Sequence, residues 1–356
     1  MKRILHVVGA RPNFMKVAPV YRALVGRAEQ VLVHTGQHYD SQMSGVFFEQ
    51  LGIPAPDVNL EVGSGSHAAQ TAQIMLRFEP VVQERRPDWV IVYGDVNSTM
   101  AATLVCSKLL VPVAHVEAGL RSRDRTMPEE VNRLVTDALA DVLFTPSADG
   151  NENLEREGVP AQKVHLVGNV MIDTLQRLLP LADTAAARAR FGVPDRFALV
   201  TLHRPSNVDR AETLESIMEA LADVAQKIEV IFPIHPRTRA RILEQRIAVP
   251  GSVRLLDPLG YLEFLALQRA AAVVITDSGG VQEETTYLGI PCITVRENTE
   301  RPVTASVGTN VLVGRDMARL RAEVDRALRG TERRGSVPPL WDGRAGDRIA
   351  DVLVRS

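Results

Sequence analysis

The sequence predicts an α/β protein with two similar halves, each a parallel sheet covered by helices on both sides. Short apolar runs rich in β-branched residues alternate with longer helical stretches along the 356 residues, a pattern typical of parallel sheets. Six such runs precede residue 168 and six follow it. A chain of this length is long for one core and comfortable for two domains.

Each predicted strand is a short, mostly apolar run, as expected of strands buried on both faces. The first half contributes Ile4–Val8, Val31–His34, Val90–Tyr93, Val113–Val116, Val142–Phe144 and Val164–Val167. The second half contributes Phe197–Leu202, Val230–Pro233, Val253–Leu256, Val273–Thr276, Cys292–Val295 and Val311–Val313. Ligands of open parallel sheets bind at the carboxyl ends of the strands. We therefore expect reactive residues just after these runs, in a cleft between the two sheets.

The domain boundary is expected near Gly168, before an amphipathic helix that begins at Met171. Residues 330–346 are rich in Gly, Pro and Arg, and a short helix over residues 347–355 closes the chain. We expect that helix to return to the first half. The predicted domains are thus residues 1–168 with 339–356, and residues 169–338.

Composition excludes several classes of function. The formal net charge is −2, which does not suggest a nucleic-acid or anionic-membrane partner. The two cysteines, Cys106 and Cys292, lie far apart in apolar segments and resemble reduced core residues of a cytoplasmic protein. No run approaches the roughly 20 apolar residues of a membrane span. The N-terminal apolar run is short and followed at once by Arg11 and Pro12, so it is interpreted as a first strand and not as a signal peptide.

The stretch from Ala270 to Leu288 predicts an anion-binding turn. Its strand ends in Asp277, Ser278, Gly279 and Gly280, where a helix begins. Free backbone N–H groups and the helix dipole at such a start suit a phosphate or diphosphate, and glycine lets the backbone approach it. The alternative is an ordinary strand-turn-helix corner capped by Ser278.

Three strand ends of the first half carry charged groups. Arg11 and Lys16 follow the first strand, where two cations suit a phosphate or carboxylate. Asp95 follows the third strand and is either a reactive carboxylate or a helix N-cap. Glu117 ends the fourth predicted strand and should be partly buried. Such a carboxylate is either ion-paired, with Arg121 as the candidate partner, or has a shifted pKa suited to a reaction.

A further carboxylate starts the helix after that strand. Glu129 and its neighbour Glu130 either complement the helix dipole, or Glu129 joins Asp95 and Glu117 in one pocket. Three neighbouring carboxylates with mutually shifted pKa values would suit proton transfer.

The second half places titratable, cationic and aromatic groups after its strands. His203 follows the first of them and is suited to contact a phosphate or protonate a leaving group. His235 follows the next. Phe264 either packs in the core or faces a flat heterocycle. Arg301 lies beyond another strand, beside the expected diphosphate.

The sequence lacks the motifs of common cofactor sites. Residues 63–68 match the dinucleotide pattern formally, but they follow no convincing strand, and the acidic residue expected on the second strand is missing. A nicotinamide cofactor is therefore disfavoured. With no P-loop, HExxH or clustered Cys/His set, no metal and no other cofactor is indicated.

Taken together, the motifs resemble the non-hydrolysing UDP-N-acetylglucosamine 2-epimerases. The motifs, which span most of the chain from Ile4 to about Gly314, are GARPNFMK, TGQHYD, GDVNST, HVEAGLRS, MPEEVNR, LHRPSN, PIHPRT, DSGGVQEE and ENTERP, in this order. The resemblance implies a glycosyltransferase-B-like architecture, two Rossmann-like domains around a cleft, and a homodimer. It also implies interconversion of UDP-GlcNAc and UDP-ManNAc without a redox cofactor, by anti elimination of UDP and re-addition to a 2-acetamidoglucal.

The resemblance also implies roles for particular residues. Its catalytic positions match Asp95, Glu117, Glu129 and His203. Its positions for the UDP-sugar match Arg11, Lys16, Phe264, Ser278, Gly279, Gly280, Glu284 and Arg301. Gln37, Gln70 and His235 lie in segments like those that bind a second UDP-GlcNAc as an activator in some bacterial members.

Two departures and two alternatives accompany this resemblance. Val96 stands where the family commonly has Thr, and HRPSN lacks the acidic residue found beside the histidine in HRREN or HRAEN. One alternative is 2-epimerisation of a modified UDP-sugar, such as a UDP-diacetamido-uronate. The other is a glycosyltransferase on the same fold.

Overall fold

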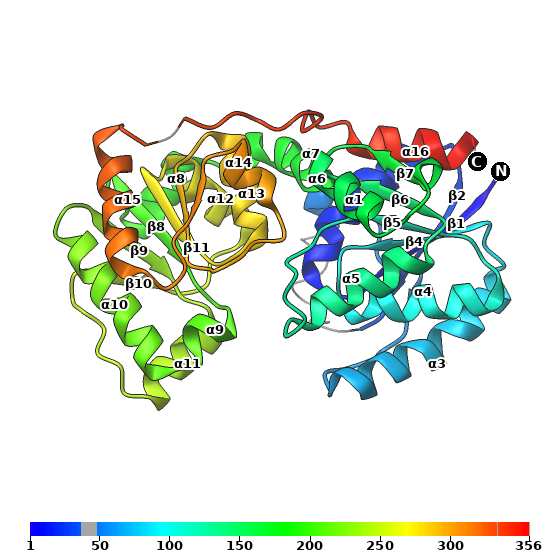
Figure 1. Ribbon diagram of the computed structural model, residues 1–356, viewed down its shortest axis with the longest axis horizontal. Helices are drawn as coiled ribbons and strands as arrows, with labels where there is room; N and C mark the ends of the chain where they lie inside the picture. The colour runs from blue at the N-terminus through cyan, green and yellow to red at the C-terminus, as the bar shows by residue number, and fades with distance from the viewer. Residues whose placement is uncertain (37–47, 333, 356) are drawn as a thin grey trace. The chain divides into compact units, whose positions relative to one another are not determined.

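The protein forms two compact units, and the chain enters the second unit once and leaves it once. In the computed structural model, unit 1 comprises Met1–Gln176 and Pro339–Ser356, and unit 2 comprises Arg177–Pro338 (Figure 1). The structure describes residues 1–36, 48–332 and 334–355. Among the helices described, none is both long enough and apolar enough to cross a membrane.

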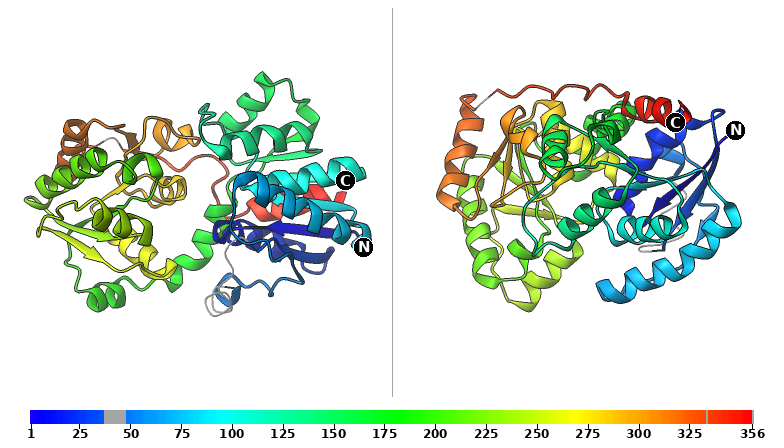
Figure 2. Two further views of the ribbon diagram at one scale, coloured as in Figure 1. Left: turned by 90° about the horizontal axis from the view of Figure 1, so that it is seen from below. Right: turned by 45° about the vertical axis from the view of Figure 1, so that its right-hand side comes forward.

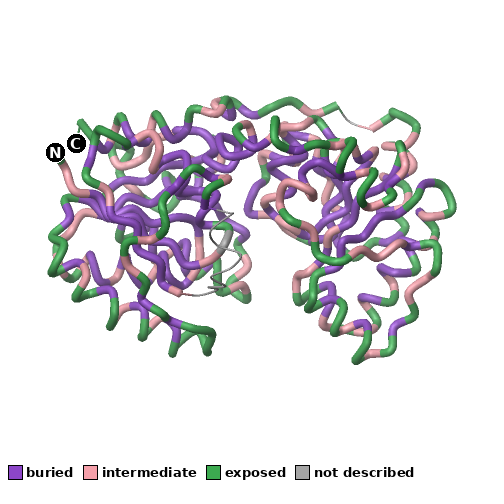
Figure 3. The backbone as a smooth tube through the Cα atoms, turned by 180° about the vertical axis from the view of Figure 1, so that it is seen from behind, coloured by how far each residue is buried: buried purple, intermediate pink, exposed green. Residues whose placement is uncertain are grey.

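Unit 1 is built on a parallel sheet with the strand order β3-β2-β1-β4-β5-β6-β7. Its strands are β1 (Arg3–Val8), β2 (Glu29–His34), β3 (Val58–Asn59), β4 (Trp89–Tyr93), β5 (Val113–Val116), β6 (Val142–Thr145) and β7 (Val164–Leu166). Its helices are α1 (Arg11–Leu24), α3 (His67–Arg85), α4 (Asn97–Leu109), α5 (Pro128–Leu139), α6 (Ala148–Arg156), the 3-10 helix Ala161–Lys163, most of α7 (Val170–Leu178) and α16 (Ala345–Arg355). The central strands are buried on both faces, as Figure 3 shows in purple.

Unit 2 repeats the design on a second parallel sheet, with the order β10-β9-β8-β11-β12-β13. Its strands are β8 (Phe197–Thr201), β9 (Glu229–Pro233), β10 (Val253–Leu256), β11 (Val273–Thr276), β12 (Cys292–Thr294) and β13 (Asn310–Leu312). Its helices are the 3-10 helix Leu179–Leu181, α8 (Thr184–Phe191), α9 (Pro205–Val208), α10 (Ala211–Ala225), α11 (Pro236–Glu244), α12 (Tyr261–Ala270), α13 (Gly279–Leu288), α14 (Pro302–Ser306) and α15 (Met317–Arg329).

The predicted α/β class and the strand positions are confirmed. Each of the six strands predicted in either half is present, with ends that differ by a residue or two. The strand that the sequence did not indicate, β3, is two residues long and pairs at the edge of the sheet with Val33 and His34. Because it is only half-buried, it lacks the apolar run that marks its neighbours.

The first passage between the units lies further along the chain than predicted. The boundary was expected near Gly168, but the chain leaves unit 1 within α7, between Gln176 and Arg177. The first two turns of α7 are bonded to unit 1: the Thr174 hydroxyl donates to the carbonyl of Met15 at 2.6 Å, and Asp173 accepts from the backbone N–H of Gly346 at 2.8 Å. These bonds keep the start of the helix in unit 1.

The last helix returns to unit 1 and packs against α1 (Figures 1 and 2). Ile349 and Leu353, one helical turn apart, are fully buried there. The carboxylate of Asp173 accepts from the N–H groups at the start of α16, which would otherwise lack partners. Burial nevertheless raises the pKa of Asp173 to about 6.

Gly168 is predicted to be the residue of this junction that tolerates substitution least. Its φ is +89°, and an added Cβ would collide with the carbonyl oxygen of Leu340 on the returning segment. Gly168→Ala should lower the free energy of unfolding of unit 1 by about 2–4 kcal/mol, because overpacking adds to the cost of a left-handed alanine. Tryptophan fluorescence in a denaturant titration reports on this unit, since both tryptophans, Trp89 and Trp341, belong to it.

Gly158→Ala is the matched control for this prediction. Its φ is +79°, but within the described chain an added Cβ would have no heavy atom within 4 Å. It should therefore cost only the backbone strain, about 1–2 kcal/mol. Equal losses in the two variants would contradict the packing argument.

Candidate functional site

The candidate residues of unit 1 follow three strands that are neighbours in the sheet. Strands β1, β4 and β5 lie side by side, and Lys16, Asp95 and Glu117 come after their carboxyl ends. The structure brings Lys16 and Glu117 into direct contact. Of the two other predictions at this edge, the side chain of Arg11 and the whole of Gln37 lie outside the described residues.

The turn after β1 is held in place by Asn13. Its side-chain oxygen accepts from the N–H groups of Gly9 and Ala10 at 3.1 and 3.0 Å, and its amide donates to the carbonyl of Tyr93 at 2.8 Å. The last bond ties the start of α1 to the end of β4. The first turns of α1 are thereby oriented so that the buried side chain of Lys16 points back to the sheet edge.

Glu117 is a buried carboxylate on a strained turn. Its φ is +75°, an uncommon conformation for a residue with a side chain, and the side chain forms an ion pair with the ammonium of Lys16. Gly94 makes room for this pair, because a Cβ at that position would lie 2.5 Å from the Lys16 Nζ. Arg121, the partner expected from the sequence, directs its guanidinium to Asp137 and Glu157 at 2.7 and 2.6 Å.

Asp95 is not the N-cap of the helix that follows it, because Val96 occupies that position. The carboxylate of Asp95 forms an ion pair with Arg133 of α5 instead, and its carbonyl accepts from the side-chain amide of Asn132 at 2.8 Å. Its side chain remains 26 % exposed. Asp95 is therefore held by α5 while still open to solvent or ligand.

The two glutamates at the start of α5 differ sharply in environment. Glu129 is exposed, whereas Glu130 is buried. Glu130 accepts from the backbone N–H groups of Ser122 and Arg123 at 2.9 and 2.8 Å and from the Arg133 guanidinium at 2.6 Å. Although burial opposes them, these bonds hold the pKa of Glu130 below its usual value. Glu130 is thus a fixed anion that supports the loop, and Glu129 is the carboxylate that a ligand can reach.

Gln70 lies in the same unit, on α3. It is buried, and its side-chain oxygen accepts from the amide of Asn97 at 2.7 Å. Asn97 in turn accepts from the amide of Asn132 at 3.2 Å. Gln70 is therefore connected through two amides to the helix that holds Asp95.

In unit 2, Asp277 organises the turn that carries His203. The backbone N–H groups of His203 and Arg204 donate to its carboxylate at 2.9–3.2 Å, and Asn207 donates at 3.0 Å. Burial acts to raise the pKa of Asp277, but these bonds and His203 lower it below its usual value. Nδ1 of His203 lies 3.2 Å from Asp277, and its side chain is 42 % exposed, so the ring is oriented by the carboxylate and accessible on its other side.

His235 lies next to His203. The two ring centroids are 6.0 Å apart. His235 is the N-cap of α11, and its Nδ1 accepts from the N–H of Arg237 at 3.2 Å. Burial, together with the neighbouring His203 and Arg237, lowers the pKa of His235. It is therefore a neutral imidazole at the same sheet edge.

The turn at Ser278 has the geometry of an open helix start. Ser278 occupies the N-cap position of α13, yet within the described residues its side chain makes no capping hydrogen bond. The alternative interpretation, a corner capped by the Ser278 side chain, is therefore not what the structure shows. Gly279 is packed against Arg301: a Cβ there would lie 2.5 Å from the guanidinium and 2.8 Å from the carboxylate of Glu300. The structure thus brings Ser278, Gly279 and Arg301 together.

Arg301 is part of a chain of buried charges. Its guanidinium contacts Glu283 at 2.8 Å and Glu300 at 2.5 Å. Glu300 also contacts Arg296 at 2.7 Å and Arg204 at 3.5 Å. Burial opposes ionisation of Glu300, but the neighbouring arginines hold its pKa well below its usual range. These bonds fix the orientation of Arg301 beside the start of α13.

Glu284 is buried in the second turn of α13, where it accepts from the hydroxyl of Tyr261 at 2.8 Å. Burial raises its pKa to about 7, despite the hydrogen bond from the Tyr261 hydroxyl. Phe264, one turn beyond Tyr261 on α12, is half-buried. Its ring is therefore not part of the fully buried core, which was one of the two interpretations of the sequence.

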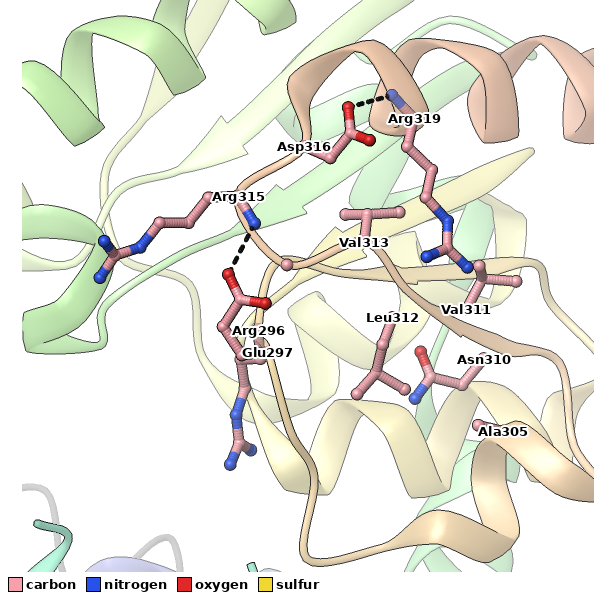
Figure 4. Close-up of a pocket in the computed structure, with 11 residues that line it drawn as sticks. Arg296, Glu297, Ala305, Asn310, Val311, Leu312, Val313, Arg315, Asp316 and Arg319 are labelled. Atoms are coloured by element: carbon pink, nitrogen blue, oxygen red, sulfur yellow. Dashed lines mark hydrogen bonds between the residues drawn. The ribbon is translucent and has the colours of Figure 1, made fainter. Parts of the chain in front are cut away.

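A pocket of about 720 Å³ lies in unit 2, beside the carboxyl ends of β12 and β13. It is lined by residues that include Arg296, Glu297, Asn310, Arg315 and Arg319 (Figure 4). Two backbone N–H groups in it are already bonded to acidic side chains, that of Arg315 to Glu297 at 3.2 Å and that of Arg319 to Asp316 at 2.8 Å. The predicted anion turn does not line this pocket.

Sequence reasoning assigned no role to several residues that hold the candidates in place. They are Asn13, Asn132, Arg133, Asp137, Asp277 and Glu300. Asp277 was the easiest to find, since an acid directly after a buried strand needs donors. The others lie inside helices or loops, where a polar residue looks like ordinary surface.

No group of three or more His, Cys, Asp and Glu side chains able to hold a metal ion is present in the described parts of the chain. The charged and titratable groups that the structure places at these strand ends are carboxylates, histidines and arginines. Carboxylates suit proton transfer, and an arginine beside an open helix start suits an anion.

The protein has two Rossmann-like units, with carboxylates at the strand ends of unit 1 and an arginine beside an open helix start in unit 2. This combination defines an enzyme of the glycosyltransferase-B-like fold. The crystal structure of Methanocaldococcus jannaschii UDP-GlcNAc 2-epimerase in complex with UDP-GlcNAc and UDP is similar, with a TM-score of 0.92 and 41% identity over 99% of this chain and 100% of that one. The M. jannaschii UDP-N-acetylglucosamine 2-epimerase sequence is 42% identical over 359 residues, 98% of both chains. The UDP-2,3-diacetamido-2,3-dideoxy-D-glucuronate 2-epimerase of Pseudomonas aeruginosa is also 42% identical, over 360 residues and 99% of both chains.

The family itself follows from a match along almost the whole chain. Residues 23–354 match the model of the UDP-N-acetylglucosamine 2-epimerase family. The chain belongs to this family and is an isomerase.

Glu284 gives unit 2 a predictable dependence on pH. Its folded-state pKa of about 7 exceeds the usual 4.5, so its protonated form favours the folded state, and this stabilisation is lost as pH rises from about 4.5 to about 7. Without ligand, Glu284→Gln should therefore gain up to about 3 kcal/mol relative to the parent protein between about pH 5 and about pH 8. Chemical unfolding followed by circular dichroism at both pH values measures the difference.

Glu219→Gln is the matched control, because Glu219 is exposed on α10 of the same unit. Its stability relative to the parent should not change with pH over this range. A pH dependence of unfolding that is the same in Glu284→Gln as in the parent would contradict the assignment.

Proposed function

We propose that the protein is a UDP-N-acetylglucosamine 2-epimerase that interconverts UDP-GlcNAc and UDP-ManNAc without hydrolysis. The observation that carries the proposal is the Glu117 site, a carboxylate buried beside Lys16 on a strained turn, next to the partly open Asp95. The family match and the M. jannaschii relative supply the substrate class.

The proposed reaction begins with removal of the C2 proton by a carboxylate. The C1–O bond to UDP breaks as a C1–C2 double bond forms, which gives 2-acetamidoglucal and UDP. UDP then adds back to C1, and a proton is delivered to the opposite face of C2. Two groups on opposite faces are required, and Asp95, Glu117 and Glu129 are the carboxylates proposed for proton transfer.

Unit 2 is proposed to bind the UDP. The open start of α13 at Ser278, Gly279 and Gly280 suits a diphosphate, and Arg301, fixed by its glutamates, would stabilise the charge that develops as UDP departs. His203 is accessible and is proposed to contact the same phosphates. Glu284 and Phe264 are proposed to contact ribose and uracil, and Arg11 and Lys16 of unit 1 the sugar nucleotide.

Four further properties belong to the proposal. The protein is proposed to act as a homodimer in the cytoplasm and to supply UDP-ManNAc for polysaccharide synthesis. It is also proposed to bind UDP-GlcNAc as an effector through Gln37, Gln70 and His235. Equilibrium sedimentation tests the first, and the dependence of the reverse rate on added UDP-GlcNAc tests the last.

Incubation with UDP-GlcNAc in deuterium oxide, followed by NMR, tests the reaction. We expect UDP-ManNAc to form and deuterium to enter C2 of both sugars, because the proton that returns comes from solvent. Release of free ManNAc and UDP would indicate a hydrolysing enzyme instead. Absence of both C2 exchange and UDP-ManNAc would reject this substrate, and transfer that needs an added acceptor would identify a glycosyltransferase.

A second candidate substrate is a UDP-2,3-diacetamido-2,3-dideoxy-glucuronate. The observation in its favour is the P. aeruginosa epimerase of that sugar, as similar to this chain as the M. jannaschii enzyme. Competition between the two sugars in one reaction gives the ratio of their kcat/KM values directly. A ratio above one for UDP-GlcNAc supports the first candidate, and a ratio below one supports the second.

Glu117→Gln should lower the rate of C2 exchange at least about 100-fold if this carboxylate transfers a proton. The amide keeps the shape of the side chain but cannot accept the proton. Rates are compared per UDP-binding site, counted by calorimetry, so that a loss of folded protein is not mistaken for a loss of chemistry. The control is Glu155→Gln, on the exposed surface of α6, and a near-parental rate in Glu117→Gln would refute the role.

A further inference from the structure

Asp137 is a fully buried carboxylate on α5 that binds both sides of the Glu117 turn. Its Oδ1 accepts from Nδ1–H of His115 at 2.6 Å, and its Oδ2 accepts from the backbone N–H of Gly119 at 3.0 Å. Oδ2 also contacts the guanidinium of Arg121 at 2.7 Å. One side chain therefore contacts the second residue before Glu117 and the second residue after it.

His115 extends this contact to the neighbouring strand end. Its Nε2 donates to the carbonyl of Gly94 at 2.8 Å, directly before Asp95. Through its two ring nitrogens, His115 therefore connects Asp137 to the end of β4.

The turn that Asp137 holds needs such support. A residue with a side chain in the left-handed region costs about 1–2 kcal/mol, and Glu117 has a φ of +75°. The N–H groups of Glu117 and Ala118 both donate to the carbonyl of Phe144 at 3.0 Å. The next N–H group of the turn, that of Gly119, donates to the carboxylate of Asp137 instead.

Both oxygens of Asp137 have partners. Arg121 pairs with Asp137 at 2.7 Å and also with Glu157 at 2.6 Å. Burial acts to raise the pKa of Asp137, but His115 and Arg121 lower it below its usual value. A buried group is thus held in its charged form, which is costly unless such partners are present.

The same helix fixes the Asp95 turn one helical turn earlier. Asn132 and Arg133 bind the carbonyl and the carboxylate of Asp95, and Asp137 follows Arg133 by four residues, on the same face of α5. Asp95 and the Glu117 turn are therefore both held by side chains of one helix, α5.

We propose that Asp137 is a positioning residue for the reaction: through His115 and Gly119 it holds the backbone of Glu117 and the carbonyl before Asp95 in place. It does so without touching the substrate. This inference rests on the proposed function, because it assumes that Glu117 and Asp95 serve proton transfer.

Asp137→Asn is the direct test. The amide offers one acceptor in place of two, so its NH₂ group faces a donor on His115, Gly119 or Arg121. The turn should shift, and displacement of reacting groups by about 1 Å costs about 100-fold in rate. We expect kcat for C2 exchange to fall at least about 10-fold, while KM and the calorimetric affinity for UDP stay within about twofold, since the UDP residues lie mainly in unit 2. A smaller loss of kcat overturns the proposal.

Glu157→Gln is the matched control. It removes the other carboxylate that contacts Arg121, a side chain that is 33 % exposed and is not bonded to His115 or Gly119 by any contact that the structure describes. It should lower stability slightly and leave kcat at the parental value. An equal fall of kcat in both variants would overturn the proposal, because it would trace the effect to charge balance and not to position.

If Asp137→Asn does not fold, two substitutions of His115 test the positioning role of Asp137. In His115→Gln the amide can replace Nε2 and still donate to Gly94, but it withdraws the donor from Asp137. In His115→Asn the amide can replace Nδ1 and still donate to Asp137. The Gln variant should lose at least about 10-fold in kcat and more than the Asn variant; a Gln variant that turns over as fast as the Asn variant overturns the proposal.

Failure of this inference is distinct from failure of the proposed function. All variants are assayed with whichever UDP-sugar the parent protein epimerises. A parent protein without C2 exchange refutes the proposed function itself. A fully active parent with fully active Asp137→Asn or His115→Gln refutes the positioning role alone.

Discussion

Burying a carboxylate at the end of a parallel strand requires a cation or several donors beside it, and the arrangement of both units follows from this constraint. In unit 1, Glu117 lies against Lys16 and Asp95 against Arg133. In unit 2, Asp277 collects backbone and side-chain donors, and Glu300 lies among arginines. Because a buried charge without a partner costs several kcal/mol, each candidate group comes with a supporting group. The supporting groups, in turn, decide where the candidates point.

The two units use this constraint in opposite ways. In unit 1 the ion pairs orient the carboxylates of Glu117 and Asp95, which are groups that can accept a proton. In unit 2 the acids are the supports, and the group left facing the helix start is Arg301, which suits an anion. Glu284 is the exception, because burial favours its neutral form. An uncharged carboxyl group beside Tyr261 can donate as well as accept a hydrogen bond.

Much of the fold could be predicted because parallel strands are buried on both faces, so their sequences are short apolar runs. The same logic placed Lys16, Asp95, Glu117, His203 and Arg301 at strand ends. It failed where tertiary contacts decide. The sequence left open whether Asp95 is an N-cap, and it offered Arg121 as the partner of Glu117, whereas Arg121 pairs with Asp137 and Glu157. The chain also leaves unit 1 beyond Gly168. The partners that decide these points are tens to hundreds of residues away in the sequence. Likewise, only the position of each side chain on α5 separates exposed Glu129 from buried Glu130.

The return of α16 to unit 1 has a consequence for how the chain acquires its structure during synthesis. The ribosome completes all of unit 2 before residues 345–355 emerge, so the face of α1 that α16 covers stays exposed to solvent throughout that interval. Domains generally fold in the order in which they are made, yet here unit 1 begins before unit 2 and is completed after it. The nascent chain therefore carries an uncovered apolar surface on unit 1 until residues 345–355 emerge, and a chaperone or a second nascent chain would bind at that surface.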